Sequence, residues 1–310
     1  MNKISGNEFI KVVEVGPRDG LQNEAKIIAT TDKAKLIQGL VAAGLQNIEI
    51  TSFVSPKWIP QLADNLDLVK LLDLPDNITT LALVPNQKGY EIAKQAKIKQ
   101  MSFFMSATQS HSKKNINKSI EEALEVIKGL ASAAKEDKIA TRAYVSCAFF
   151  CPYEGKVDFR QVTPIISSLI QMGIDEISVG DTIGYATPRQ VNDLLHDLIN
   201  EVPVHKIAMH FHDTFGMALA NVYASIESGV RIFDTSFGGM GGCPYAPGAS
   251  GNLATEDLVY LLDNLGFKTS INLNKLMEVS IMAENIIGRS LPSKYLQANK
   301  AKNLHKQEVK

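Results

Sequence analysis

Residues 10–20 read Ile10-Lys-Val-Val-Glu-Val15-Gly-Pro-Arg-Asp-Gly20, a short β-branched run followed by a polar turn between two glycines. A strand that leads through such a turn into a helix is the repeating unit of α/β proteins. The turn does not contain the G-x-G-x-x-G fingerprint of a dinucleotide-binding sheet. The first strand therefore favours another α/β architecture.

The same alternation of a short strand with a longer amphipathic stretch continues along most of the chain. Helical windows such as 32–43, 120–134, 188–201 and 217–228 separate the strands, and several of them end in a glycine. Thr187 and Pro188 fit the N-cap and first turn of one helix. Eight strand-then-helix units predict a (β/α)8 barrel, the TIM barrel, rather than an open doubly wound sheet. The expected strands are 10–15, 47–51, 79–84, 101–105, 141–146, 176–179, 206–211 and 231–236.

The length of 310 residues suits one such barrel with a C-terminal extension. We expect a single catalytic domain over residues 1–299, which includes a further helix near 273–287. No proline- and serine-rich linker divides the chain. Residues 300–310 are rich in lysine, glutamine and asparagine, so we expect them to form a polar tail.

Composition excludes several classes of function. The 32 Lys and Arg residues nearly balance the 33 Asp and Glu residues, which argues against a basic nucleic-acid surface or a polybasic membrane anchor. Neither a signal peptide nor an apolar run of membrane-spanning length is present. The three cysteines, Cys147, Cys151 and Cys243, do not have the spacing of a zinc ribbon or a disulfide framework. We therefore expect a soluble protein of the cytoplasm.

Reacting groups of TIM barrels lie at the carboxyl ends of the strands, and unusual polar residues follow the first two strands here. Arg18 can hold a developing oxyanion and Asp19 is a hard oxygen ligand, although a surface Arg–Asp pair is the alternative. Glu49 stands between Ile48 and Ile50 and should point into the barrel mouth, with Arg18 as a partner. A structural salt bridge and direct chemistry both fit Glu49.

Later strands end in further candidates. Asp181 follows the sixth strand, where it can position a substrate hydroxyl or a metal-bound water, or cap the next turn. His210 and His212 alternate along the seventh strand, so both can face one metal ion. Two buried histidines held by ordinary hydrogen bonds are the alternative.

A glycine-rich segment follows the eighth strand: residues 238–252 hold six of the 21 glycines. This composition predicts a loop that bends sharply or approaches a ligand closely. Cys243 within it can act as an acid near an active-site cation, or be an inert thiol. Asn252 can be an amide ligand of a metal, or the N-cap of the next helix.

Taken together, Asp19, His210, His212 and Asn252 offer two oxygens and two imidazoles. This set suits Mg2+ or Mn2+ better than a closed structural zinc site. With neutral imidazoles and one carboxylate, the metal keeps a net charge of about +1, which favours a bidentate anionic substrate such as a hydroxy acid.

These motifs resemble the hydroxymethylglutaryl-CoA lyase family, with a similarity that runs from about Val12 to Asn299. The Arg-Asp-Gly and His-x-His elements are shared with isopropylmalate, homocitrate and citramalate synthases, whereas the cysteine-containing loop is specific. The motifs are Val15-Gly-Pro-Arg-Asp-Gly-Leu-Gln-Asn-Glu24, Thr51-Ser-Phe-Val-Ser-Pro-Lys-Trp58, His210-Phe-His-Asp-Thr214, Gly241-Gly-Cys-Pro-Tyr245 and Gly248-Ala-Ser-Gly-Asn-Leu-Ala-Thr-Glu-Asp257.

The resemblance implies cleavage of 3-hydroxy-3-methylglutaryl-CoA to acetyl-CoA and acetoacetate with Mg2+ or Mn2+. It implies that Arg18 stabilises the thioester enolate, that Cys243 is the active-site cysteine and that His210 also lies near the tertiary hydroxyl. Glu49 and Asp181 match acidic positions that influence catalysis. The metal ligands it implies are Asp19, His210, His212 and Asn252, and the other substrate contacts are Gln22, Lys114 and Asn115, with plain solvated lysines as an alternative for residues 113–115.

The resemblance also implies an acyl-CoA substrate, a homodimer, and a place in leucine degradation or ketone-body metabolism. The barrel begins almost at once, which suggests a bacterial-type cytoplasmic enzyme, and the tail has no cysteine, so we expect no thiol regulation through it. Two alternatives remain: a carbon–carbon bond-forming synthase of the same superfamily, and a non-catalytic barrel that binds a metal or coenzyme A.

Overall fold

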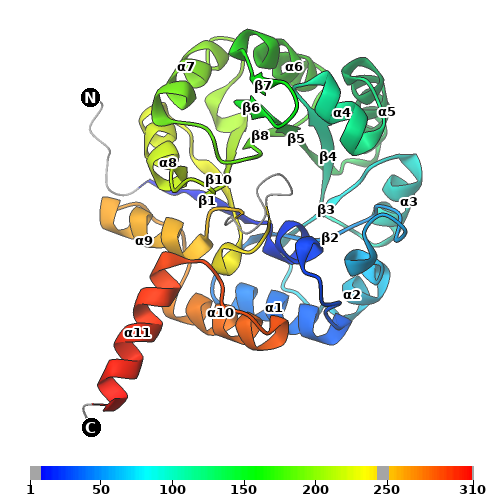
Figure 1. Ribbon diagram of the computed structural model, residues 1–310. Coiled ribbons are helices and arrows are strands. Elements are labelled where there is room, and N and C mark those ends of the chain that lie inside the picture. Colours follow the sequence, from blue (N-terminus) through cyan, green and yellow to red (C-terminus); the bar gives the residue numbers. More distant parts are fainter. Residues whose placement is uncertain (1–7, 243–250, 309–310) are drawn as a thin grey trace.

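The expected β-branched runs form the wall of a closed barrel in the computed structural model, which describes residues 8–242 and 251–308 (Figure 1). Every neighbouring pair of strands in the wall is parallel. The spatial order is β1-β10-β9-β8-β5-β4-β3-β2, so the predicted TIM barrel is confirmed. Its strands are β1 (Lys11–Glu14), β2 (Asn47–Ser52), β3 (Thr79–Leu83), β4 (Gln100–Ser106), β5 (Ala140–Ser146), β8 (Glu176–Asp181), β9 (Ile207–Phe211) and β10 (Ile232–Thr235).

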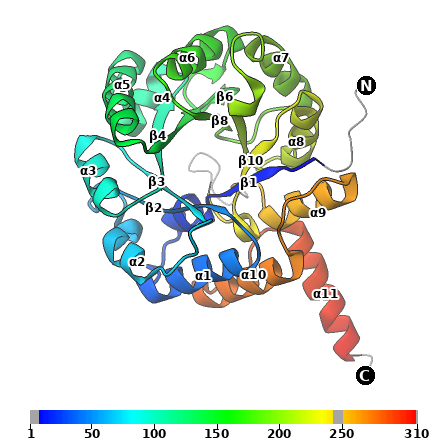
Figure 2. The same cartoon turned by 180° about the vertical axis from the view of Figure 1, so that it is seen from behind.

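Helices surround this wall on all sides (Figures 1 and 2). Gly44, Gly173 and Gly229 adopt positive φ angles at three helix ends, as the sequence predicted. Pro188 begins α7 directly after its N-cap Thr187. The helices are α1 (Thr30–Ala42), α2 (Asn65–Leu71), α3 (Gln87–Gln95), α4 (Gln109–Ile116), α5 (Ile120–Asp137), α6 (Phe159–Gln171), α7 (Pro188–Leu198), α8 (Ala218–Glu227), α9 (Thr255–Leu265), α10 (Leu273–Ile287) and α11 (Lys294–Glu308).

Strand side chains alternate between an apolar outer layer and a largely polar interior. Ile48 and Ile50 of β2 belong to the main hydrophobic core under the helices, whereas Glu49 between them points inward. A smaller apolar cluster, which includes Val13 and Leu81, is separate from this core. The barrel interior therefore places charged side chains where water is largely excluded.

The C-terminal extension consists of two helices. Helix α10 packs against α1, and α11 projects from the barrel (Figure 1). The residues expected to form a polar tail are therefore helical as far as residue 308. The Asp257 carboxylate accepts hydrogen bonds from the backbone N–H groups of Lys294 and Tyr295, at 3.0 and 2.8 Å, and so satisfies donors that a helix start leaves free.

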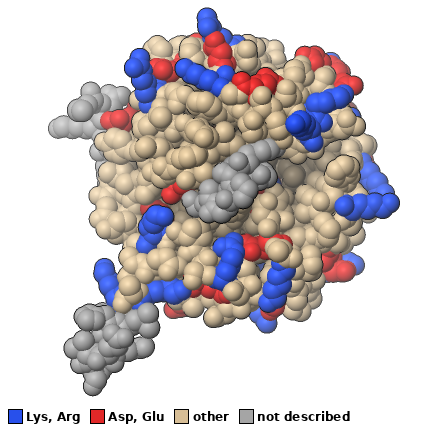
Figure 3. All heavy atoms as spheres, viewed as in Figure 1, with Lys and Arg blue, Asp and Glu red and all other residues tan. Residues whose placement is uncertain are grey.

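A small antiparallel hairpin, β6 (Phe150–Cys151) and β7 (Gly155–Lys156), lies between β5 and α6 and was not expected from the sequence. None of the helices described is long and apolar enough to cross a membrane. On the face shown in Figure 3, charged side chains of both signs are scattered rather than gathered into one basic patch. This distribution agrees with the balanced composition.

Candidate active site

The turn after β1 brings a cation and an anion to the barrel mouth. The chain leaves β1 in a short π-helical turn, η1 (Gly16–Gly20), which carries Arg18 and Asp19. Arg18 is 6% exposed and donates from Nη1 to Asp19 Oδ1 at 2.8 Å. Its Nε donates to Glu49 Oε2 at 2.6 Å, so the expected Arg18–Glu49 pair is present.

Tyr144 of β5 joins this pair from across the barrel. Its hydroxyl donates to Glu49 Oε2 at 3.0 Å, and its ring centroid lies 5.3 Å from the Arg18 guanidinium carbon. Two donors thus reach one oxygen, Oε2, of the fully buried Glu49 carboxylate. Tyr144 was not among the site residues predicted from the sequence.

The period-two alternation of β9 brings two imidazoles to the same mouth. One ligating atom each from Asp19, His210 and His212 lies within 4.8 Å of the others, so these three side chains can hold a metal ion. Burial and, to a smaller extent, the neighbouring His210 lower the pKa of His212 to about 3. Burial alone would raise the pKa of Asp19, but the Arg18 guanidinium outweighs it and the pKa lies below its usual value. Both groups are therefore in the form that binds a cation.

Asn252 reaches this group through a short antiparallel bridge with His212. Its Nδ2 donates to Asp19 Oδ2 at 2.8 Å. Helix α9 begins three residues later with Ala254 as its N-cap, so the expected alternative of an N-cap role for Asn252 is wrong. Gly241 permits this approach, because a Cβ there would lie 2.7 Å from Asn252 Nδ2 and its φ is +121°.

The four side chains fit a divalent cation. Among the described residues, His212 Nδ1 and Asn252 Oδ1 are buried and accept no hydrogen bond. Leaving such acceptors without a partner is costly, and a cation is one partner that would satisfy them. A carboxylate, an amide oxygen and two imidazoles form a ligand set typical of an open site for a hard or borderline metal ion.

Behind the imidazoles lies a buried ionic network that the sequence analysis missed. Arg142 of β5 is fully buried and contacts Asp234 of β10 and Glu176 of β8, with nitrogen–oxygen distances of 2.5 and 2.7 Å. Asp234 also contacts His210 Nδ1 at 3.3 Å. Each is a charged residue within a predicted strand, the signal that marked Glu49, so the same reasoning could have found them.

Asp181 turns toward its own loop. Its two oxygens accept hydrogen bonds from the backbone N–H groups of Tyr185 and Ala186, at 3.1 and 3.0 Å. Burial raises its pKa to about 6. The expected turn-capping role is therefore the one that the geometry supports.

The remaining candidates lie farther out. Gln22 donates to Asp19 Oδ1 at 3.0 Å and so helps to orient that carboxylate. Lys114 and Asn115 are exposed on α4, with Lys114 Nζ 4.0 Å from the ring centroid of Tyr153. Cys243 lies outside the described residues.

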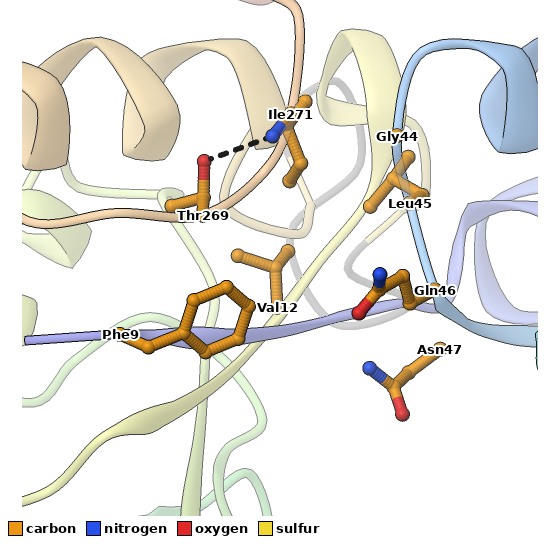
Figure 4. Close-up of a pocket in the computed structure, with 8 residues that line it drawn as sticks. All are labelled: Phe9, Val12, Gly44, Leu45, Gln46, Asn47, Thr269 and Ile271. Carbon is orange, nitrogen blue, oxygen red and sulfur yellow. Dashed lines mark hydrogen bonds between the residues drawn. The ribbon is translucent and has the colours of Figure 1, made fainter. Parts of the chain in front are cut away.

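A pocket at the opposite end of the barrel carries no comparable chemistry (Figure 4). It lies beside the amino ends of β1 and β2, and its lining side chains include no ionisable group. Its polar side chains are Gln46, Asn47 and Thr269, and the Thr269 hydroxyl accepts the N–H of Ile271 at 3.3 Å. The cluster around Asp19 is therefore the candidate active site.

Known proteins match the chain along almost its whole length. A family model described as HMGL-like matches residues 9–282. The hydroxymethylglutaryl-CoA lyase of Bacillus subtilis is 49% identical over 292 residues, which cover 94% of this chain and 98% of that protein.

Solved structures agree with these sequence matches. The crystal structure of the Bacillus subtilis HMG-CoA lyase has a TM-score of 0.93 at 48% identity and covers 94% of this chain and 98% of its own. A structure of an HMG-CoA lyase from Acinetobacter baumannii, in complex with coenzyme A and 3-methylmalate, has a TM-score of 0.90 at 35% identity. That match covers 96% of this chain and 97% of the other.

Proposed function

The chain belongs to the HMGL-like family, and we propose that it is a carbon–carbon lyase that cleaves 3-hydroxy-3-methylglutaryl-CoA to acetyl-CoA and acetoacetate. The observation that carries this proposal is the placement of Arg18 beside the cluster of Asp19, His210 and His212 at the carboxyl end of the barrel. An oxyanion-binding cation and a metal-binding cluster in one mouth are what this cleavage needs.

Asp19, His210, His212 and Asn252 would hold a divalent cation, which we propose is Mg2+ or Mn2+. Such a cation, when bound, supplies positive charge that attracts a carboxylate and acidifies a nearby hydroxyl. The mixed oxygen and nitrogen ligands and the two unsatisfied buried acceptors support this assignment.

Cleavage breaks the bond between C2 and C3 of the acyl chain. The tertiary hydroxyl gives its proton to a base and its oxygen becomes the ketone of acetoacetate, while the electron pair of the broken bond passes to a thioester enolate. The enolate takes a proton at C2 and becomes acetyl-CoA. Arg18 suits this enolate, because Glu49 and Asp19 engage its Nε and Nη1 and orient its Nη2 donors.

The other candidates take supporting roles in this proposal. Cys243 is the proton donor to the enolate or lies close to the donor's route. Lys114 and Asn115 bind the coenzyme A part, which their exposure on the carboxyl-end face supports. Gln22 orients Asp19, and Asp181 acts by shaping its loop.

We also propose that residues 1–299 act as one catalytic domain and that the enzyme works as a homodimer in the cytoplasm. The low cysteine content supports a reducing compartment. The resemblance to the lyase family supports the homodimer and a role in leucine degradation or ketone-body metabolism.

The decisive assay incubates the purified protein with Mg2+ or Mn2+ and 3-hydroxy-3-methylglutaryl-CoA and measures acetoacetate. We expect acetoacetate and acetyl-CoA in equal amounts. No acetoacetate from folded, metal-loaded protein would overturn the proposal. The synthase alternative predicts instead that acetyl-CoA and a keto acid condense and release the free coenzyme A thiol.

Two variants separate metal binding from proton transfer. His212→Ala should weaken metal binding measured by calorimetry, whereas the exposed His196→Ala should not. Cys243→Ala should lower kcat with nearly unchanged metal affinity. Unchanged affinity in His212→Ala would remove His212 from the ligand set.

A further inference from the structure

Asp234 lies directly behind His210 inside the barrel and is 1% exposed. His210 Nδ1 is 3.3 Å from Asp234 Oδ2. The same oxygen accepts the hydroxyl of Ser178 at 2.6 Å and Arg142 Nη1 at 3.1 Å. Arg142 Nη2 donates to the other oxygen, Oδ1, at 2.5 Å. Both oxygens of Asp234 are thus acceptors.

This arrangement decides which nitrogen of His210 carries the hydrogen. A guanidinium that donates to both oxygens of a carboxylate favours the ionised form, and an ionised carboxylate can only accept hydrogen bonds. The hydrogen between Asp234 and His210 therefore lies on Nδ1. A neutral imidazole in this form keeps its lone pair on Nε2.

We propose that Asp234 is a positioning residue that fixes His210 in the Nδ1–H tautomer, so that Nε2 faces the cation site formed with Asp19 and His212. Arg142 holds Asp234 in place for this task. This role concerns the same metal site as the proposed function. The expected effect on metal affinity rests on the proposed function, whereas the tautomer of His210 does not. Carboxylates in this position orient metal-binding histidines and strengthen them as ligands.

In this tautomer both ring nitrogens of His210 are already in use. Its Nδ1–H donates to Asp234, and its Nε2 lone pair serves the cation. Neither nitrogen then has a lone pair for a substrate proton. His210 therefore acts near the tertiary hydroxyl as a ligand and not as the proton acceptor.

Glu176 provides a matched control for Asp234. It is 5% exposed and accepts Arg142 Nε at 2.7 Å, as Asp234 accepts the other end of the same guanidinium. Its second oxygen accepts Lys11 Nζ at 2.7 Å rather than a histidine. Asp234→Asn and Glu176→Gln each remove one negative charge beside Arg142, but only Asp234→Asn changes the acceptor of His210.

The first experiment records the nitrogen NMR spectrum of metal-free protein with 15N-labelled histidine rings, at about pH 8.5, where an ordinary imidazole is neutral. The signals of His210 are assigned from their loss in His210→Gln. We expect a protonated Nδ1 and an unprotonated Nε2 in the wild type and in Glu176→Gln, and a shift toward the other tautomer in Asp234→Asn. A protonated Nε2 in the wild type would overturn the proposal without any need for the variant to fold.

The second experiment measures Mn2+ binding by electron paramagnetic resonance. Asp234→Asn should bind Mn2+ about 10- to 100-fold more weakly, the usual cost of losing such a partner, and Glu176→Gln should stay near the wild-type value. Equal weakening in both variants would assign the effect to Arg142 and overturn the role of Asp234. If the wild-type protein shows the expected tautomer but cleaves no substrate, the proposed function fails while the positioning role stands.

Discussion

Two pairs of buried carboxylates lie on opposite sides of the barrel wall in opposite surroundings. The inner pair, Glu49 and Asp234, points into the barrel and contacts Arg18 and Arg142. The outer pair, Glu14 and Glu256, lies behind the wall and, within the described part of the chain, accepts bonds from backbone N–H and hydroxyl groups. All four side chains are at most 1% exposed.

Different partners give Asp234 and the outer pair different protonation. Burial alone would raise the pKa of Asp234, but the Arg142 guanidinium outweighs it and lowers the pKa. With no cation beside them among the described residues, burial raises the pKa of Glu14 to about 8 and that of Glu256 to about 7. Equal burial therefore keeps Asp234 charged and allows Glu14 and Glu256 to be neutral.

The two pairs also support different parts of the site. The inner pair orients Arg18 and His210, which face the reacting groups in our proposal. Glu14 bonds the N–H of Gly16, at the start of η1, and that of Phe237, at the start of the short turn η5 (Phe237–Gly239). Glu14 thus fastens the turn that carries Arg18 and Asp19, whereas the inner pair contacts Arg18 and His210 themselves.

Removing the Arg142 guanidinium, which contacts Asp234 of the inner pair, should have the largest effect on stability. Arg142→Met leaves Asp234 and Glu176 buried without their guanidinium, and the loss of one partner of such a pair costs about 3–5 kcal/mol. Urea unfolding measures this loss of unfolding free energy. Lys11→Met is the control, because Lys11 contacts Glu176 with a side chain that is 29% exposed. This substitution should lower the free energy of unfolding by about 1 kcal/mol or less. Equal losses would show that the interior does not depend on Arg142.

The outer pair should make stability depend on pH. Between its usual value of 4.5 and about 8, Glu14 is protonated in the folded protein and ionised in the unfolded chain. The folded state then binds more protons, so stability falls as pH rises through this window, by at most about 1.4 kcal/mol per pH unit for one group. Glu14→Gln imitates the neutral acid and should reduce this slope.

Urea unfolding at several pH values between 5 and 8 measures the slope. Glu256 contributes its own share and remains in Glu14→Gln, so the slope should decrease without vanishing. Glu125→Gln is the control, because this carboxylate has a side chain that is 74% exposed. An unchanged slope in Glu14→Gln would show that Glu14 is ionised in the folded protein.

Removing a single hydroxyl donor should give the smallest loss of stability. Ser178 donates to the ionised Asp234 at 2.6 Å, and Ser280 donates to Glu256. At pH 6, Ser178→Ala should cost about 1.5–3 kcal/mol and Ser280→Ala about 1 kcal/mol, because hydrogen bonds to charged groups are the stronger ones. Unfolding of the two variants under identical conditions gives both values. The reverse order would contradict the assignment of charge to Asp234.

Much of the fold could be predicted from the sequence, because strand and helix periods are local properties. The alternation of Ile48, Glu49 and Ile50 predicted the inward carboxylate, and the spacing of His210 and His212 predicted two imidazoles on one face. The helix over residues 294–308 was missed, because its first donors are satisfied by Asp257, a residue of another helix.

The candidate site was predictable in its ligand types but not in its pairings. The sequence left Asn252 open between a helix cap and a metal ligand, and the start of α9 three residues later excluded the cap. Arg142 and Asp234 are 92 residues apart and meet only because β5 and β10 enclose the same interior. The role of Asp181 could likewise not be predicted, because the two backbone N–H groups that donate to it belong to a folded loop.

By itself the sequence determined the eight strands, the barrel that they form and the residue types at their carboxyl ends. These follow from side-chain alternation and turn chemistry within a few neighbouring residues. Only the tertiary structure decided which buried carboxylates face a guanidinium and which face neutral donors. Charge state depends on groups that are close in space rather than in sequence, and closing the barrel is what brings those groups together.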